Sequence, residues 1–240
     1  MALKKIKILF LDILTDDPKA RKIVNKQIYR GTYSEATRKA FGLRKDQWLT
    51  VYASKEVFPK KLDFDALIMG GSFENPVGNN DKSWMKKTYA FIRLVIKNQI
   101  PILGICGGLQ FTVRALGGQI MFNPKGKEFG SITLSTTESG KKDLLFRGLS
   151  KKFPAQASHK CMLKNFKPGW KLLASSEMCK PQAIAINSTV RLLQFHPEMQ
   201  ISYLKGYAKW RKEAFTHPPK NTQKTNRIIL NNFLRYFVLK

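Results

Sequence analysis

The stretch Pro101-Ile-Leu-Gly-Ile-Cys-Gly-Gly-Leu-Gln110 decides how the rest of the sequence is interpreted. Its first half is apolar and β-branched, which predicts a buried strand ending at Cys106, and a helix is expected almost at once, over residues 109–116. Glycines stand two residues before the cysteine, at Gly104, and two residues after it, at Gly108. This spacing is the nucleophile-elbow pattern with cysteine in place of serine.

Small residues suit such a turn for a physical reason. A nucleophile between a strand and a helix holds a strained backbone, and glycines let the two elements pack closely. The helix N-terminus then directs its free N–H groups and positive dipole end at the sulfur, which favours the thiolate. The backbone N–H of Gly107 would lie where an oxyanion donor belongs. The alternative is that Cys106 is a buried structural cysteine beside a glycine-rich turn.

A second segment, Arg191-Leu-Leu-Gln-Phe-His-Pro-Glu198, favours the catalytic interpretation. Residues two apart in an extended chain point the same way, so His196 and Glu198 can face one partner. A carboxylate beside an imidazole fixes its tautomer and stabilises the imidazolium that forms when the ring takes a thiol proton. Glu198 is one of only three acidic residues after Asp143. Together with the cysteine elbow, this pair predicts nucleophilic catalysis.

Outward from these segments, apolar stretches alternate with helical patterns. Buried strands are expected at residues 6–11, 48–52, 66–69 and 101–105. Helical patterns occupy residues 18–41, with a break at Gly31, and residues 84–97. Shorter strands with hairpin-like connections are expected at residues 131–135, 172–174, 183–186 and 191–195. A helix after Met199 should reach about residue 215, and a closing helix should span residues 227–239.

This alternation predicts an α/β fold, a three-layer and mostly parallel sheet with helices on both faces. A chain of 240 residues can bury a sizeable core. No repeat or long linker divides it, so we expect a single domain over residues 1–240, with C-terminal helices in residues 202–240 packed on it. The basic segment 18–45 has no assigned role, although its position between two strands would suit a lid.

The charge is the unusual part of the composition, because 43 Lys and Arg against 16 Asp and Glu give a formal net charge of +27. Such a field attracts anionic partners, including nucleic acid, acidic membrane surfaces and nucleotides. Aromatic residues do not interleave with the basic ones in a stacking pattern, so nucleic acid is a partner that we do not favour. A lysine-rich solvated surface explains the charge as well.

The other composition figures exclude several classes. With 43% hydrophobic and 25% charged residues, the chain is ordinary for a globular protein, not a disordered or fibrous one. Its apolar runs are too short to span a bilayer, and Asp12 interrupts the apolar N-terminal stretch, which argues against a secretory signal. Three widely spaced cysteines do not form a disulfide framework, so we expect a cytoplasmic protein.

The two informative segments resemble the signatures of the class I glutamine amidotransferases. The run from Gly104 to Gln110 fits the G-x-C-x-G-x-Q signature of that family, and Gln-Phe-His-Pro-Glu fits its His-Glu signature. The resemblance covers roughly the first five-sixths of the chain and implies the flavodoxin-like fold of the family. It implies that Cys106 is the nucleophile, His196 the general base and acid, and Glu198 the orienting carboxylate. Gln110 would help to hold the substrate glutamine.

Further segments resemble substrate-binding parts of the same family. Met69-Gly70-Gly71-Ser72 looks like its glycine-rich oxyanion loop, which implies that Gly71 and Gly107 supply two N–H donors. The pair Ser158 and His159 resembles one that grips the amino-acid end of the substrate. The alternative for His159 is a plain surface residue.

One position departs from the family pattern. Members that use free glutamine commonly carry an acid two residues after the second histidine, where it binds the substrate ammonium group, and this chain has Cys161 there. Either another acid takes that role, with Glu74 and Asp81 as candidates, or free glutamine is not the preferred substrate. Glu128-Phe129-Gly130 resembles a further family element that precedes a strand.

The implied chemistry is acyl transfer through a γ-glutamyl thioester, with no cofactor. We find no metal-ligand spacing and no nucleotide-binding glycine loop. We favour a stand-alone hydrolase of glutamine or a γ-glutamyl peptide. The first alternative is the glutaminase subunit of a two-component synthetase, resembling the amidotransferase part of GMP synthase. The second is a non-catalytic basic binding protein, which the three intact residues of the proposed triad argue against.

Overall fold

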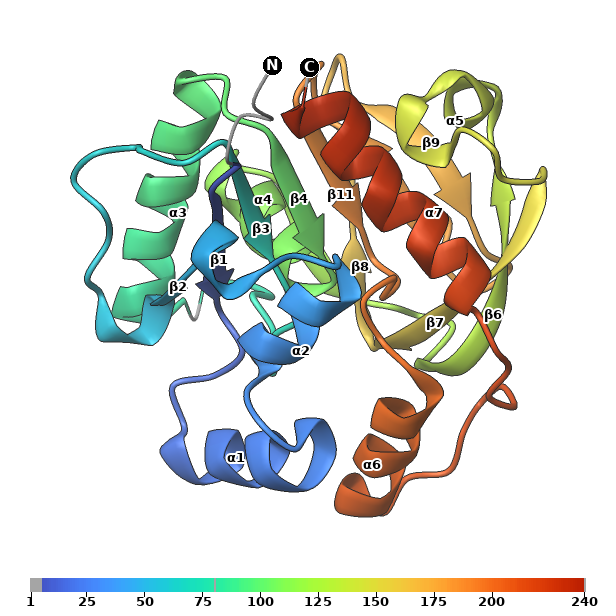
Figure 1. Cartoon of the computed structure of the whole chain (residues 1–240). Coiled ribbons are helices and arrows are strands. Elements are labelled where there is room, and N and C mark those ends of the chain that lie inside the picture. The colour runs from blue at the N-terminus through green and yellow to red at the C-terminus, as the bar shows by residue number, and fades with distance from the viewer. Residues whose placement is uncertain (1–5, 80, 240) are drawn as a thin grey trace.

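The computed structural model describes residues 6–79 and 81–239, and these residues form a central sheet covered by helices (Figure 1). Within this part of the chain the large sheet has nine strands in the order β2-β1-β3-β4-β11-β10-β9-β6-β7. Their bounds are β1 Ile8–Asp12, β2 Trp48–Tyr52, β3 Ala66–Met69, β4 Ile102–Ile105, β6 Glu128–Thr136, β7 Lys152–His159, β9 Lys171–Ser175, β10 Ala183–Ala185 and β11 Val190–Leu193. Strands β5 (Ile120–Phe122) and β8 (Cys161–Leu163) pair separately.

The sheet has a parallel half and an antiparallel half. Strands β2, β1, β3, β4 and β11 pair in parallel. From β11 onward, β10, β9, β6 and β7 pair antiparallel. Strands β1, β3, β4 and β11 are buried along their whole length, which is why they appear in the sequence as continuous apolar runs without alternation. The predicted α/β class with a large parallel sheet is confirmed.

Helices cover both faces of the sheet. Their bounds are α1 Pro18–Ile23, α2 Tyr33–Ala40, α3 Ser83–Lys97, α4 Gly107–Ala115, α5 Glu138–Lys142, α6 Ile201–Arg211 and α7 Gln223–Phe233. Alternate residues of β1 show the two cores: Leu9 belongs to the apolar cluster that includes residues of α3 and α4, whereas Phe10 belongs to the cluster that includes residues of α2, α6 and α7. Helices α6 and α7 contribute Leu204 and Phe233 to the second of these cores. Among the described residues, no helix is long and apolar enough to cross a membrane.

Several expected boundaries differ from the structure for local reasons. The helix after Met199 ends at Arg211, not near residue 215, because Lys212 adopts the left-handed conformation at φ 53°. The closing helix begins at Gln223 and finishes as a wide π turn over Leu234–Val238. Strand β7 was not expected at all, since Pro154 and scattered polar residues hide its pattern.

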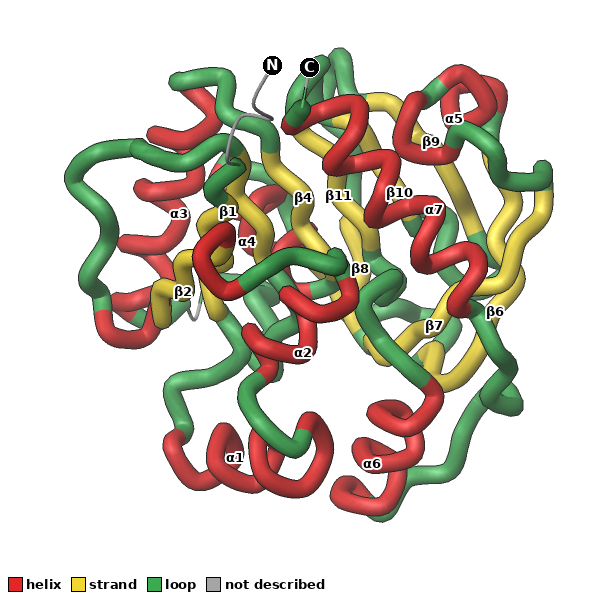
Figure 2. The backbone as a smooth tube through the Cα atoms, viewed as in Figure 1, coloured by secondary structure: helices red, strands yellow, loops and turns green. Residues whose placement is uncertain are grey.

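The segment between β1 and β2 breaks into three pieces and packs beside α6. Helix α1 runs into the π turn η1 (Val24–Tyr29), and Arg30 at φ 51° ends it before α2 begins. Figure 2 shows this segment and α6 at the same end of the molecule. Their contact is aromatic, since the ring of Tyr29 meets the rings of Tyr203 and Tyr207 edge-on.

The elbow depends on close approach of three neighbouring backbones. A Cβ atom on Gly104 would lie 2.7 Å from the Gly108 carbonyl and 2.7 Å from Leu192 Cδ2. A Cβ atom on Gly108 would lie 2.7 Å from the carbonyl oxygen of Met69 on β3. These two glycines therefore allow β3, β4 and α4 to meet at one point.

We expect Gly104→Ala to lower the free energy of unfolding by about 1–3 kcal/mol, since overpacked sites carry costs of that size. The exposed Gly31, where an added Cβ meets nothing closer than 4.0 Å, gives the matched control. Gly31→Ala should change stability by less than about 0.5 kcal/mol. Urea unfolding followed by circular dichroism measures both, and equal effects of the two substitutions would contradict the packing argument.

Candidate active site

The candidate site lies at the carboxyl ends of three adjacent parallel strands. Strand β3 ends before Gly70, β4 ends before Cys106, and β11 ends just before the segment that carries His196. Because β3, β4 and β11 are neighbours in the sheet, residues far apart in sequence meet at this edge. Ligand sites of open α/β sheets lie at such strand ends.

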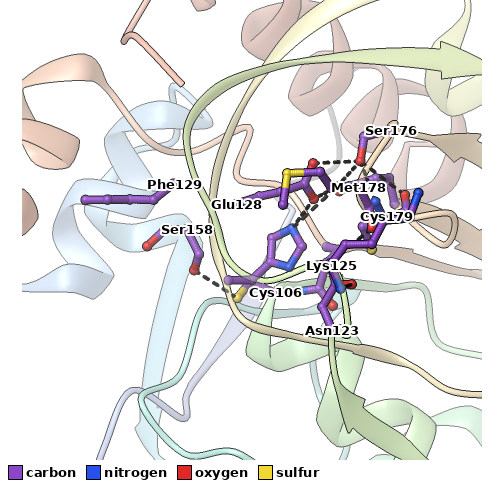
Figure 3. A network of polar contacts seen from close by, with 12 residues as sticks. Cys106, Asn123, Lys125, Glu128, Phe129, Ser158, Ser176, Met178 and Cys179 are labelled. Atoms are coloured by element: carbon purple, nitrogen blue, oxygen red, sulfur yellow. Dashed lines mark hydrogen bonds and ion pairs between the residues drawn. The ribbon is translucent and has the colours of Figure 1, made fainter. Parts of the chain in front are cut away.

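Cys106 occupies a strained turn between β4 and α4. Its backbone has φ 51° and ψ −98°, a conformation that a side-chain-bearing residue rarely adopts. Helix α4 begins at Gly107, directly after the cysteine and two residues earlier than expected. The backbone N–H of Cys106 donates to Leu193 O at 2.7 Å, which ties the elbow to β11. Its thiol contacts the Ser158 carbonyl oxygen at 4.0 Å (Figure 3).

His196 and Glu198 face each other as the spacing predicted. His196 Nδ1 lies 2.7 Å from Glu198 Oε1, and both residues are only 4% exposed. Among the described residues, His196 Nε2 has no hydrogen-bond partner, so this nitrogen is available to exchange a proton with a nearby thiol or substrate. Burial alone would lower the pKa of His196, but the charges of Glu198 and Cys106 and the hydrogen bond to Glu198 raise it to about 10.

Cys106 and His196 also share a small cavity. Both line it together with Tyr33, Ser158 and Arg211. The thiol is close enough to contribute to the raised pKa of the imidazole. The structure therefore brings Cys106, His196 and Glu198 into one group, in which the carboxylate binds Nδ1 of the ring and the thiol lines the same cavity as the ring.

The glycine-rich loop holds an unexpected partner. The N–H of Gly71 donates to the hydroxyl of Tyr33 at 2.6 Å. In this arrangement the amide is committed to Tyr33, and the expected role of Gly71 in an oxyanion hole would require that bond to break. Gly107 packs against Ser72 of the same loop, with no space for a side chain between them. Tyr33 was missed because it lies in the segment 18–45, where nothing in the sequence marks it.

A pocket of about 330 Å³ opens beside Cys106. It contains three residues for which substrate binding was expected, Gln110, Ser158 and His159. Its lining as a whole is Ser72, Phe73, Glu74, Asn75, Cys106, Gln110, Lys127, Ser158, His159, Lys160, Cys161, Trp210, Arg211 and Glu213. Acidic and basic side chains therefore line the same pocket as the Cys106 thiol.

The acidic residues that line this pocket bear on which residue replaces the acid missing at position 161. Glu74 lines the pocket, whereas Asp81 does not and instead forms an ion pair with Arg114 at 2.6 Å. Asp81 is therefore the wrong candidate for the missing acid. Glu213, which no pattern in the sequence singled out, also lines the pocket. It reaches the site because α6 ends at Arg211 and turns back.

His159 is buried and is not the surface residue of the alternative. It is 4% exposed; its Nε2 lies 3.0 Å from Glu128 Oε2 and its Nδ1 lies 3.2 Å from the carbonyl oxygen of Cys161. Gln182 donates to Glu128 Oε2 at 2.6 Å. Ser176 donates to Glu128 Oε1 at 2.7 Å, as Figure 3 shows. His159 thus supports the pocket wall through a hydrogen-bonded network.

This network is a second group of cysteine, histidine and glutamate. One carboxylate oxygen of Glu128, one ring nitrogen of His159 and the sulfur of Cys179 all lie within 4.8 Å of one another. The three residues are too far apart in the sequence for their spacing to predict this contact. We assign it no metal and no nucleophile. Glu128 and His159 already bind each other, and burial and the charge of Glu128 raise the pKa of Cys179 far above its usual range, so the thiol stays protonated.

The comparison with known families agrees with this geometry. The profile of the family described as Glutamine amidotransferase class-I matches residues 32–207. The chain belongs to the class-I glutamine amidotransferases. The matched range includes Cys106, His196 and Glu198 as well as Tyr33.

Individual class-I amidotransferase relatives were also found. A glutamine amidotransferase-like protein of Schizosaccharomyces pombe is 30% identical over 199 residues, which are 79% of this chain and 78% of the relative. One subunit of the glutamine-hydrolysing GMP synthase of Sulfolobus acidocaldarius is 32% identical over 139 residues, 58% of this chain and 69% of that subunit. The crystal structure of a glutamine amidotransferase from Methylobacillus flagellatus superposes with a TM-score of 0.73 at 16% identity, covering 96% of this chain and 94% of that one. The last likeness shows the shared fold.

The raised pKa of His196 makes a prediction about stability. Folding raises this pKa from 6.5 to about 10, so the imidazolium stabilises the fold fully below pH 6.5, and that contribution is lost as the pH rises through 10. The stability difference between the unaltered chain and His196→Gln should therefore shrink from about pH 6 to about pH 10. Denaturant titrations across this range measure it, with His217→Gln as the control. A difference that stays constant would contradict the assignment.

Proposed function

We propose that this class-I amidotransferase hydrolyses a γ-glutamyl amide, either glutamine or a γ-glutamyl peptide, through a γ-glutamyl thioester on Cys106. The observation that carries the proposal is the strained elbow that presents the Cys106 thiol to a histidine held by a buried carboxylate. Strain of this kind persists only where the surrounding structure over-determines it, and it is typical of activated nucleophiles.

The proposed reaction uses His196 twice. His196 takes the thiol proton, and the thiolate attacks the γ-carbonyl carbon to form a tetrahedral oxyanion. The imidazolium gives its proton to the leaving nitrogen, the C–N bond breaks, and ammonia or an amine departs, leaving the thioester. Water then attacks the thioester carbonyl carbon while His196 accepts its proton. The C–S bond breaks, glutamate is released, and His196 returns the proton to the sulfur, which restores the thiol. Glu198 holds the ring and stabilises its charged form in both steps.

The pocket supports a zwitterionic substrate. Arg211 has no carboxylate partner within residues 6–79 and 81–239, and its guanidinium donates to Ser158 Oγ at 3.3 Å, so we propose that it receives the substrate carboxylate. Glu74 and Glu213 line the same pocket, where Glu74 pairs with Lys82 at 3.1 Å and Glu213 pairs with Lys127. We assign these two acids to the substrate ammonium group, which would replace a lysine as their partner and fill the role of the acid missing at position 161. Gln110 lies in the same lining and would contact the substrate side chain.

A second candidate is the glutaminase subunit of a two-component synthetase in the cytoplasm. The observation that favours it is the likeness to the GMP synthase subunit of Sulfolobus acidocaldarius, a protein named as one part of a larger enzyme. On this proposal the chain passes ammonia to a synthetase partner and is slow until that partner binds. Activity of the isolated chain on γ-glutamyl peptides distinguishes the stand-alone hydrolase from this alternative.

The two cysteine groups give a direct test of the proposed function. Cys106→Ala should reduce ammonia or amine release from L-glutamine and γ-glutamyl dipeptides by about a thousandfold or more, the loss usual for a nucleophile. Cys179→Ala, which alters the other Cys-His-Glu group, should keep activity within a few-fold. Product release is measured with each substrate in turn. Equal activity of the Cys106→Ala variant and the unaltered chain would overturn the proposal.

A further inference from the structure

The side chain of Tyr33 joins two parts of the site that the reaction needs. Its hydroxyl accepts a hydrogen bond from the Gly71 N–H at 2.6 Å and donates one to Glu198 Oε1 at 3.0 Å. The same carboxylate oxygen bonds to His196 Nδ1 at 2.7 Å. Glu198 Oε2 has no hydrogen-bond partner among the described residues, so Tyr33 and His196 together hold the carboxylate through one oxygen.

The direction of these bonds follows from the donors present. An amide N–H can only donate, so the Tyr33 oxygen must accept from Gly71, and the phenolic proton is then free to point at Glu198. Burial and the charge of Glu198 raise the pKa of Tyr33 well above its ordinary value, so the hydroxyl keeps its proton and remains a donor. The loop amide therefore orients the tyrosine, and the tyrosine orients the carboxylate.

The surrounding structure is built to accept this side chain. Gly70 has no room for a Cβ atom, because the Tyr33 hydroxyl and ring edge occupy that space. The ring stacks on Tyr29 at 5.0 Å and meets Phe10 edge-on at 5.7 Å, and the residue is 2% exposed. Gly70 thus leaves space for the Tyr33 side chain, and Gly71 donates the hydrogen bond to its hydroxyl. Contact with Tyr33 therefore explains why position 70 is a glycine and how the amide of the next residue is used.

We infer that Tyr33 is a positioning residue of the active site, which acts on the reaction through Glu198. The inference rests on the proposed function of Cys106, His196 and Glu198. Without the hydroxyl, the buried carboxylate keeps only its bond to His196 and is free to rotate, so the imidazole is less well directed at the thiol. The loss then falls on the chemical step and not on substrate binding.

The test is a double-substitution cycle of Tyr33→Phe and Glu198→Gln. Tyr33→Phe should lower kcat for hydrolysis about tenfold while KM stays within about twofold, a loss typical of a lost supporting bond. In the Glu198→Gln background the same substitution should lower kcat by less than about twofold, because a residue that acts through Glu198 has nothing left to act on. An unchanged kcat in Tyr33→Phe, or a full tenfold loss in both backgrounds, would overturn the inference.

The matched control is Tyr29→Phe, which removes a buried hydroxyl bonded to Tyr207 at 3.0 Å but none that reaches Glu198. It should leave kcat within about twofold, and thermal unfolding should show similar stability for both tyrosine variants. If the unaltered chain releases no product, the proposed function fails separately. The inference is then read from alkylation of Cys106 by iodoacetamide, which should slow in Tyr33→Phe and not in Tyr29→Phe. Equal alkylation rates would overturn it.

Discussion

The close contact of β3, β4 and α4 at Gly104 and Gly108 is the constraint on which the site depends. The Gly108 backbone and Leu192 occupy the space that a methyl group on Gly104 would fill, and Met69 O occupies the space that one on Gly108 would fill. This contact lets the chain turn from strand to helix within one residue and leaves Cys106 at a positive φ, its side chain directed out of the sheet edge. The parallel order of β3, β4 and β11 then brings the glycine loop and His196 to the same edge. The packing of β3, β4 and α4 therefore fixes the position of the Cys106 sulfur.

The chain contains two groups of cysteine, histidine and glutamate, and their surroundings decide between them. In both, a buried glutamate is bound to a histidine, at 2.7 Å for His196 and at 3.0 Å for His159. Both ring nitrogens of His159 have partners, namely Glu128 and the carbonyl oxygen of Cys161. By contrast, Nε2 of His196 has no partner within the part of the chain that the structure describes. Burial keeps the thiol of Cys179 protonated, while Cys106 opens into a pocket of about 330 Å³. Residue identity alone therefore does not distinguish the two groups; the proposed catalytic role of Cys106 rests on the unpartnered nitrogen of His196 and on the pocket that the thiol lines.

The sequence predicted what depends on neighbours along the chain and missed what depends on neighbours in space. The strands at 48–52 and 66–69, the elbow at Cys106 and the pair of His196 and Glu198 were all readable, because each follows from local period or spacing. The approach of Glu213 and Arg211 to the pocket was not, because it depends on where α6 ends and how the chain turns back. The contact between Glu128 and His159 could not be predicted for the same reason, because it depends on the pairing of β6 with β7. Neither strand has a sequence pattern that indicates which strand it pairs with.

Tyr33 shows why the oxyanion loop and the carboxylate have to be considered together. The peptide between Gly70 and Gly71 uses both of its polar groups: the Gly70 carbonyl accepts from the N–H of Gly108, and the Gly71 N–H donates to Tyr33. The loop is thereby fixed between α4 on one side and α2 on the other. With the Gly71 amide bound to Tyr33, the proposed oxyanion role falls on the N–H of Gly107 at the first turn of α4, where the helix dipole would add to its field. Movement of α2 would alter the carboxylate and this loop at once, which couples the orientation of the histidine to the shape of the site that receives the substrate.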